Sequence, residues 1–174
     1  MTTTQNGIKT KEDQHTLSVL VSYNLNALSR IIGIFSSKGF EIDSISFGSG
    51  KESGLARITI TTHGDKQIIE QITKQLHKII DVVTVSDLTY ESFVARELAL
   101  VKVKATSTAR SEIMQIAQVF RAKVIDISPE KLAIEITGNQ DKVDAFLGMV
   151  RPFGIIEVAR TGSVALKREF NGSV

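Results

Sequence analysis

The chain of 174 residues contains no cysteine and no tryptophan, only two prolines, and 6% aromatic residues. Without cysteine there can be no disulfide, no thiolate nucleophile and no cysteine-ligated zinc or iron–sulfur centre. A cysteine-free chain fits a cytoplasmic protein, which is the localisation we expect. The few aromatic side chains offer little stacking surface for nucleic-acid bases.

An excess of charge of one sign and long hydrophobic runs are also missing. The 21 Lys and Arg against 19 Asp and Glu leave a formal charge of +2, which is no electrostatic footprint for nucleic acid. No apolar run approaches the ~18–20 residues that span a bilayer, and residues 1–13 are too polar for a signal peptide. We therefore expect partners that are neither nucleic acid nor membrane. The 42% hydrophobic residues are typical of a globular protein.

The first half of the chain predicts six elements in the order β-α-β-β-α-β. Its helices are indicated by apolar residues at i, i+3, i+4 and i+7, which in the first helix are Leu28, Ile31, Ile32 and Phe35. The six elements are a strand at 17–21, a helix that follows a turn at 22–26 and ends at Gly39, strands at 42–47 and 55–62, a helix capped by Asp65, and a strand at 82–88.

The second half repeats the same order. Its predicted strands are 98–103, 123–127, 132–137 and 155–159, and a short strand at 164–166 follows. The helix before residue 121 carries the same apolar spacing, with cap candidates at 106–108. Asn139 is the expected cap of the last helix.

Two β-α-β-β-α-β units predict an α+β protein with two ferredoxin-like domains. We place the domains at 16–90 and 96–168, with flexible tails at 1–14 and 169–174. Helices on one face of an antiparallel sheet leave the other face to be covered. A unit of this size also has a marginal core, so we expect packing between units or chains.

No pattern in the sequence indicates catalysis or metal binding. The three histidines, His15, His63 and His77, are not at metal-ligand spacing. There is no phosphate-binding loop, no Gly-x-Gly-x-x-Gly that opens a helix and no Gly-x-Ser-x-Gly elbow. We therefore expect no catalytic residue and no metal ligand in this chain.

Two other functions of ferredoxin-like folds fit less well. Small acyl-phosphate hydrolases place an arginine on the first helix, where Arg30 lies, but the turn at 24–26 is too crowded for a glycine-rich phosphate cradle. RNA-binding modules expose aromatic residues on the central strands, and 17–21 and 55–62 contain none.

The remaining candidate is the turn between the first strand and the first helix, at 22–27. A helix N-terminus presents unpaired N–H groups and a positive dipole end. These suit the carboxylate of a free amino acid, so the turn is either an effector site or an ordinary helix cap.

Several segments resemble the small regulatory subunits of acetohydroxyacid synthase, also called acetolactate synthase. The resemblance runs from residue 16 to about 168, and its most specific segment is RPFGIIEVARTG at 151–162. The other matching segments are ALSRIIGIFSSKGFEIDSI at 27–45, QITKQLHKIIDVV at 71–83, RELALVKV at 96–103, FRAKVIDI at 120–127 and KVDAFL at 142–147.

The resemblance implies an N-terminal ACT domain at 16–90, which binds branched-chain amino acids, and a C-terminal ferredoxin-like domain. Such subunits form homodimers through their ACT sheets. They bind a catalytic large subunit that carries thiamine diphosphate, Mg²⁺ and FAD, and they carry no cofactor themselves. They activate that subunit, which joins pyruvate to a second 2-keto acid with loss of CO₂, and they confer feedback control by valine, leucine or isoleucine.

The resemblance also names an effector site and shows where this chain departs from it. The family turn reads Asn-x-x-Gly-Ala-Leu, and here it is Tyr23, Asn24, Leu25, Asn26, Ala27 and Leu28. The family's Gly-Tyr-Asn-Ile is Gly-Phe-Glu41-Ile42 here, and it faces the effector from the partner chain. Tyr23, Asn26 and Glu41 replace residues suited to the effector, so we expect weakened feedback by valine.

The first interpretation is therefore a non-catalytic regulatory subunit of acetolactate synthase, active in branched-chain amino-acid biosynthesis. The alternative is an ACT-type amino-acid sensor that serves another partner. The segment at 151–162 favours the first, because it lies outside the ACT domain and resembles the small-subunit family.

Overall fold

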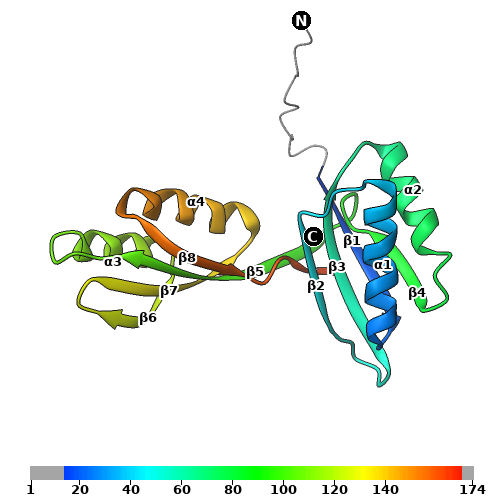
Figure 1. Cartoon of the computed structure of the whole chain (residues 1–174), viewed down its shortest axis with the longest axis horizontal. Coiled ribbons are helices and arrows are strands. Elements are labelled where there is room, and N and C mark those ends of the chain that lie inside the picture. The colour runs from blue at the N-terminus through cyan, green and yellow to red at the C-terminus, as the bar shows by residue number, and fades with distance from the viewer. Residues whose placement is uncertain (1–13, 170–174) are drawn as a thin grey trace, which may run out of the picture. The chain divides into compact units, whose positions relative to one another are not determined.

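The computed structural model describes residues 14–169, and these form two compact units (Figure 1). Of the described residues, 14–94 and 165–169 belong to the first unit and 95–164 to the second. The predicted tail at 1–14 lies outside the described residues except for its last position, and so does most of the tail at 169–174.

The first unit is a four-stranded antiparallel sheet with two helices on one face (Figure 1). The strand order β2-β3-β1-β4 is that of a ferredoxin-like fold, as predicted. Its elements are β1 (Gln14–Ser22), α1 (Leu25–Lys38), β2 (Ser44–Ser49), β3 (Leu55–His63), α2 (Lys66–Leu76) and β4 (Val82–Asp87).

The core of this unit lies between the helices and the sheet. Alternate residues of β1 and β3 face the helices, because successive strand side chains point to opposite faces. The buried residues include Leu17, Val19, Val21, Ile31, Phe35, Ile58, Ile60, Ile69, Ile72 and Leu76. Each such aliphatic side chain contributes about 1.5–3 kcal/mol on burial, so this interface holds the unit together.

Local signals for the helix ends are confirmed. Gly39 closes α1 at φ 69°, the left-handed conformation that glycine adopts without strain. The carboxylate of Asp65 accepts a hydrogen bond from the Ile68 N–H at 2.9 Å and so caps α2.

Two details of α1 differ from prediction. Helix α1 begins at Leu25, inside the expected turn, and Ile32 is 42% exposed, because the buried stripe runs through Ala27 and Ile31 instead.

The helix-free face of the first sheet is lined by small hydroxyl side chains. Ser18, Thr59 and Thr61 are buried there. The Ser18 hydroxyl accepts a hydrogen bond from Arg57 at 2.7 Å, and the hydroxyls of Ser44 and Thr61 lie 2.7 Å apart. Both central strands lack aromatic residues on this face, unlike the RNA-binding platform considered above.

The second unit repeats the fold with strand order β6-β7-β5-β8 and two helices on one face (Figure 1). Most of β5 belongs to it, and its core includes Val101, Val103, Ile113, Ile134, Val143 and Phe146. Its elements are β5 (Phe93–Lys104), α3 (Arg110–Val119), β6 (Lys123–Ser128), β7 (Lys131–Gly138), α4 (Gln140–Val150), the 3₁₀ turn η2 (Arg151–Phe153) and β8 (Ile155–Arg160). Asn139 caps α4 as predicted.

The last strand, β9 (Val164–Lys167), pairs with β5 and lies with the first unit. The Arg168 N–H donates to the Ser92 carbonyl at 2.8 Å, and Lys167 forms an ion pair with Glu91. Ala165 is buried, and its N–H lies 3.4 Å from the Thr59 hydroxyl on the helix-free face. By its contacts, β9 thus groups with the first unit from Ala165 onward.

No helix among residues 14–169 is both long and apolar enough to cross a bilayer.

Candidate effector site

The turn before α1 is built around the side chain of Asn24. Its backbone is extended, with φ −147° and ψ 153°, and its side-chain oxygen accepts a hydrogen bond from the Ala27 N–H at 2.7 Å. This is a helix N-cap, which satisfies one of the N–H groups that a helix leaves unpaired. The side chain of Asn24 therefore already has a structural role, whatever else binds here.

Asp81, just before β4, holds the turn from the other side. Its carboxylate accepts hydrogen bonds from the Asn24 amide at 3.2 Å and from Arg30 at 2.9 Å. The backbone adds a third tie, because the Ser22 N–H donates to the Asp81 carbonyl at 2.9 Å. Arg30, the cation that a hydrolase would use, thus has a carboxylate as its partner.

Tyr23 lies over the neighbouring strand. Its ring stacks on Phe47 of β2, with centroids 5.6 Å apart and planes 15° apart. Its backbone N–H donates to the Gly54 carbonyl at 2.8 Å. The stack and the hydrogen bond hold Tyr23 at the same end of the sheet as the turn, with its side chain 57% exposed.

The other candidates of the turn divide into exposed and buried residues. Leu25 is 75% exposed and Asn26 is also on the surface, whereas Ala27 is buried and Leu28 packs against the core. Side-chain contact with an effector is therefore open to Tyr23, Leu25 and Asn26. The N–H groups of the first helical turn other than that of Ala27 have no partner within the helix and suit a carboxylate.

Glu41 and Ile42 lie at the opposite end of α1. The helix has 14 residues, which at about 1.5 Å each makes a separation of roughly 20 Å from the turn. Glu41 is exposed, and its carbonyl accepts a hydrogen bond from the Thr62 hydroxyl at 2.5 Å. One chain alone does not bring the two halves of the expected site together, and the contribution of Glu41 and Ile42 from a partner chain stays a prediction.

Two histidines form pairs with aspartates that the sequence did not reveal. His15 Nδ1 lies 3.0 Å from an Asp87 carboxylate oxygen, and His63 Nδ1 lies 2.5 Å from Asp43. These partners are far along the chain and belong to other elements, so no local spacing could indicate them. Within residues 14–169 there is no cluster of three or more residues suited to hold a metal ion.

In the second unit, charged side chains connect three elements. Arg160 of β8 contacts the buried Glu97 of β5 at 2.5 Å and Asp144 of α4 at 2.8 Å. Partial burial lowers the pKa of Arg160, but the hydrogen bonds to Asp144 and Glu97 outweigh it, so the pKa lies above the ordinary value. Arg160 belongs to the segment 151–162, and its contacts there are those of a structural residue.

A second ion pair crosses the helix-free face of the same sheet. Lys102 of β5 donates to Glu157 of β8 at 2.9 Å. This hydrogen bond and the lysine charge lower the pKa of Glu157. Glu157 is well exposed, so the pair is screened by solvent and contributes little to stability.

Comparison with known proteins assigns both units to one family. Residues 17–84 match the model of the AHAS small subunit-like ACT domain, and residues 96–169 match the model described as the small subunit of acetolactate synthase. These two matches follow each other along the chain and together span most of it.

Whole-length relatives agree. The acetolactate synthase small subunit of Aquifex aeolicus is 45% identical over 91% of this chain and 83% of that protein. The acetolactate synthase small subunit of Mycolicibacterium smegmatis is 42% identical over 88% of this chain and 91% of that protein. The crystal structure of the small subunit of acetolactate synthase from Thermotoga maritima covers 89% of this chain and 97% of its own, with 39% identity and a TM-score of 0.81. The chain belongs to the family of acetolactate synthase small subunits.

Proposed function

We propose that this chain is a regulatory subunit that binds and activates the catalytic large subunit of acetolactate synthase. The observation that carries the proposal is the match of residues 96–169 to the small-subunit family. ACT domains alone could serve many partners, but here the small-subunit match begins at residue 96, soon after the ACT match ends at residue 84, and the Aquifex aeolicus relative matches over 91% of this chain. In this proposal, the thiamine diphosphate, Mg²⁺ and FAD belong to the large subunit, which performs the condensation and decarboxylation.

Activation would proceed by population shift. Docking of the small subunit favours the active arrangement of the large subunit, and an effector bound to the ACT domains favours the reverse. Any coupling requires that the effector bind the two states with different affinity. The amino-acid carboxylate would meet the first turn of α1, where Tyr23, Leu25 and Asn26 are exposed.

The effector site requires a homodimer through the ACT domains. The sheet order β2-β3-β1-β4 leaves β2 and β4 as edges with unpaired backbone groups. Edge-to-edge pairing of two sheets would satisfy one such edge in each chain. A second chain would also supply Glu41 and Ile42, which lie about 20 Å from the turn in their own chain.

Reconstitution tests the proposal. Acetolactate formation from pyruvate is measured for this chain alone, for the cognate large subunit alone, and for the two together with thiamine diphosphate, Mg²⁺ and FAD. We expect no product from this chain alone and a several-fold higher rate from the mixture than from the large subunit. An unchanged rate at saturating amounts, with no complex in gel filtration, would contradict the proposal.

A further inference from the structure

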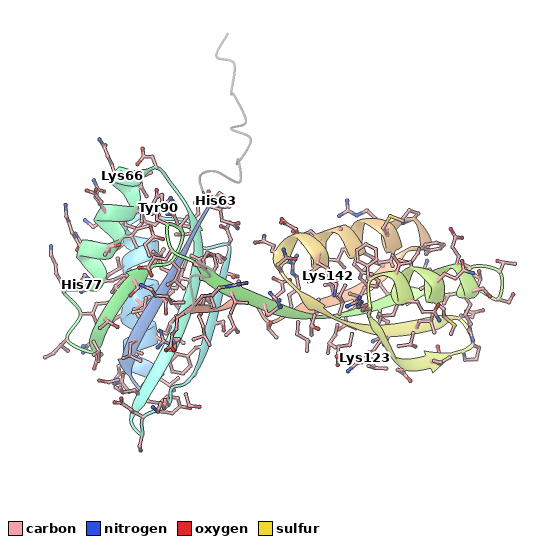
Figure 2. All side chains as sticks on the ribbon, turned by 180° about the vertical axis from the view of Figure 1, so that it is seen from behind. His63, Lys66, His77, Tyr90, Lys123 and Lys142 are labelled. Carbon is pink, nitrogen blue, oxygen red and sulfur yellow. The ribbon has the colours of Figure 1, made fainter. Side chains whose placement is uncertain are left out.

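A groove of about 470 Å³ lies in the first unit, between α1 and the C-terminal part of α2 with the loop that follows it. Residues between 30 and 37 of α1 form one wall, and residues between 75 and 80 form the other. In Figure 2, where Lys66 and His77 mark the two ends of α2, the groove belongs to the His77 end.

A glycine leaves the middle of the groove open. Gly33 lies in the interior of α1 and is exposed, and a Cβ added there would meet no atom within 4 Å outside its own stretch of helix. Another protein segment can approach the backbone at such a position more closely than at a residue with a side chain. Next to it, Ile79 is buried and Ile34 is half-buried, so the groove also has an apolar floor.

The groove keeps one positive charge after its ion pair is counted. Arg30 is paired with Asp81 at 2.9 Å, so these two charges offset each other. Lys78 forms no ion pair with a described residue, and no Asp or Glu lines the groove. Helix α1 contains no acidic residue, and Glu70 of α2 lies beside Lys74 instead. A segment that carries carboxylates is therefore favoured here.

An apolar side chain stands at the rim beside this charge. Ile80 is 88% exposed and follows Lys78 by two positions. The groove thus presents an apolar floor, an apolar rim residue and one cation. An amphipathic helix with apolar side chains and carboxylates on one face complements these three features.

Shape argues against a second copy of this chain as the occupant. A two-fold contact would bring groove against groove and Lys78 towards Lys78, which fills neither groove and repels. A head-to-tail contact would form a ring or a filament instead of a homodimer. The occupant is therefore a different protein.

One carboxylate joins the groove to the candidate effector site. Asp81 follows Ile80 directly, and it accepts hydrogen bonds from Arg30 in the groove wall and from Asn24 in the turn. The side-chain oxygen of Asn24 in turn accepts from the Ala27 N–H. A partner that displaces Arg30 or Ile80 would alter a contact of the turn. This is the kind of coupling between two sites that a regulatory subunit requires.

We propose that this groove is the docking site for the large subunit, which inserts an acidic amphipathic helix into it. Apolar side chains of that helix pack on Ile79 and Ile80 and pass over Gly33, and a carboxylate pairs with Lys78. The inference rests on the proposed function, because it takes the large subunit as the partner. It adds the surface of this chain that makes the contact and the chemistry of the segment that fills it.

Filling the groove tests the proposal. Gly33→Leu in the full chain should weaken binding of the cognate large subunit about tenfold or more in calorimetry, because a side chain then occupies the groove. Gly148→Leu is the matched control, since Gly148 is an exposed glycine inside α4 whose added Cβ also meets no atom within 4 Å. Neither change should lower the thermal unfolding midpoint, because leucine favours a helix more than glycine does.

Reversing the charge is the second test, and it decides the matter if Gly33→Leu lowers the unfolding midpoint. Lys78→Glu should weaken binding about tenfold. Lys51→Glu makes the same change in an exposed loop of the same unit and should leave the affinity nearly unchanged.

The outcomes separate this inference from the proposed function. If the unaltered chain neither binds nor activates the large subunit, the proposed function is wrong and this inference is wrong with it. If the unaltered chain binds and activates, but the groove variants bind as tightly as their controls, the large subunit docks elsewhere and only this inference is wrong.

Discussion

Tyr23 and Asn24 are two residues of the turn before α1 whose side chains have partners within the chain. The family pattern has asparagine at position 23, glycine at 26 and asparagine at 41. Here Tyr23 stacks on Phe47, and the side chain of Asn24 is engaged with Ala27 and Asp81. Neither side chain is placed to replace a missing amide, which supports the expectation of a weak valine response.

We expect valine to inhibit the reconstituted enzyme poorly. A hydrogen bond to a charged group is worth about 1.5–3 kcal/mol, so two missing amides weaken binding by ~10²-fold if the terms are partly additive. Tyr23→Asn with Glu41→Asn should restore inhibition, with Asn26→Gly added if the turn remains crowded. Tyr23→Phe is the control, because it keeps the stack on Phe47 and adds no amide. Micromolar binding of valine to the unaltered chain in calorimetry would contradict this prediction.

Arg121 has a backbone conformation that is unfavourable for a residue other than glycine. It follows α3 with φ 53° and is the one non-glycine residue at positive φ among those described. A side chain in this conformation costs about 1–2 kcal/mol, which glycine avoids. Arg121 is also exposed.

We therefore expect Arg121→Gly to stabilise the protein by about 0.5–1 kcal/mol, since the greater freedom of glycine in the unfolded chain offsets part of the gain. Urea unfolding measures the difference. Arg121→Ala is the matched control, because it removes the same side chain but keeps Cβ, and it should leave the unfolding midpoint nearly unchanged. If the glycine and alanine variants unfold at the same midpoint, the backbone conformation of residue 121 does not destabilise the protein.

At the scale of elements, ion pairs hold strands and helices of the second unit in register. Arg160 joins β8 to β5 through Glu97 and to α4 through Asp144. Glu97 is 6% exposed, and Arg160 is the cation that contacts it. Leaving a buried carboxylate without its cation costs far more than the pair contributes by itself.

Arg160→Met should accordingly lower the free energy of unfolding by about 2–4 kcal/mol. Adding Glu97→Gln removes the unpaired charge and should recover part of that loss. Lys102→Met is the comparison, because its partner Glu157 is exposed and the loss should be at most about 1 kcal/mol. Chemical denaturation of the four proteins gives these values. Equal effects of Arg160→Met and Lys102→Met would show that burial of Glu97 does not matter.

At the scale of the whole molecule, each unit is small and each sheet has open edges. We expect the chain to be at least a dimer at micromolar concentration, and light scattering measures this.

A proline in the middle of β2 tests whether this strand is the edge that joins the two chains. Ser46→Pro should then reduce association, because proline removes a backbone hydrogen-bond donor. The same change in the exposed loop, Glu52→Pro, is the control. A monomer at micromolar concentration would also remove the proposed effector site.

Much of the architecture was predictable because it depends on contacts close in sequence. The spacing of apolar residues indicated all four helices, and the caps at Gly39, Asp65 and Asn139 were confirmed, since each cap bonds to backbone within a few residues. The repeat of one strand–helix order predicted two ferredoxin-like units, which the structure shows.

The tertiary structure decided what depends on residues far apart in the chain. His15 meets Asp87, Tyr23 stacks on Phe47, and Arg160 reaches Glu97 only because strands from distant parts of the sequence pair side by side. The return of β9 to the first unit was equally hidden, because a four-residue strand carries no signal for its partner. Local periodicity determines which element forms, whereas the pairing of sheets in space determines which side chains meet and what they can bind.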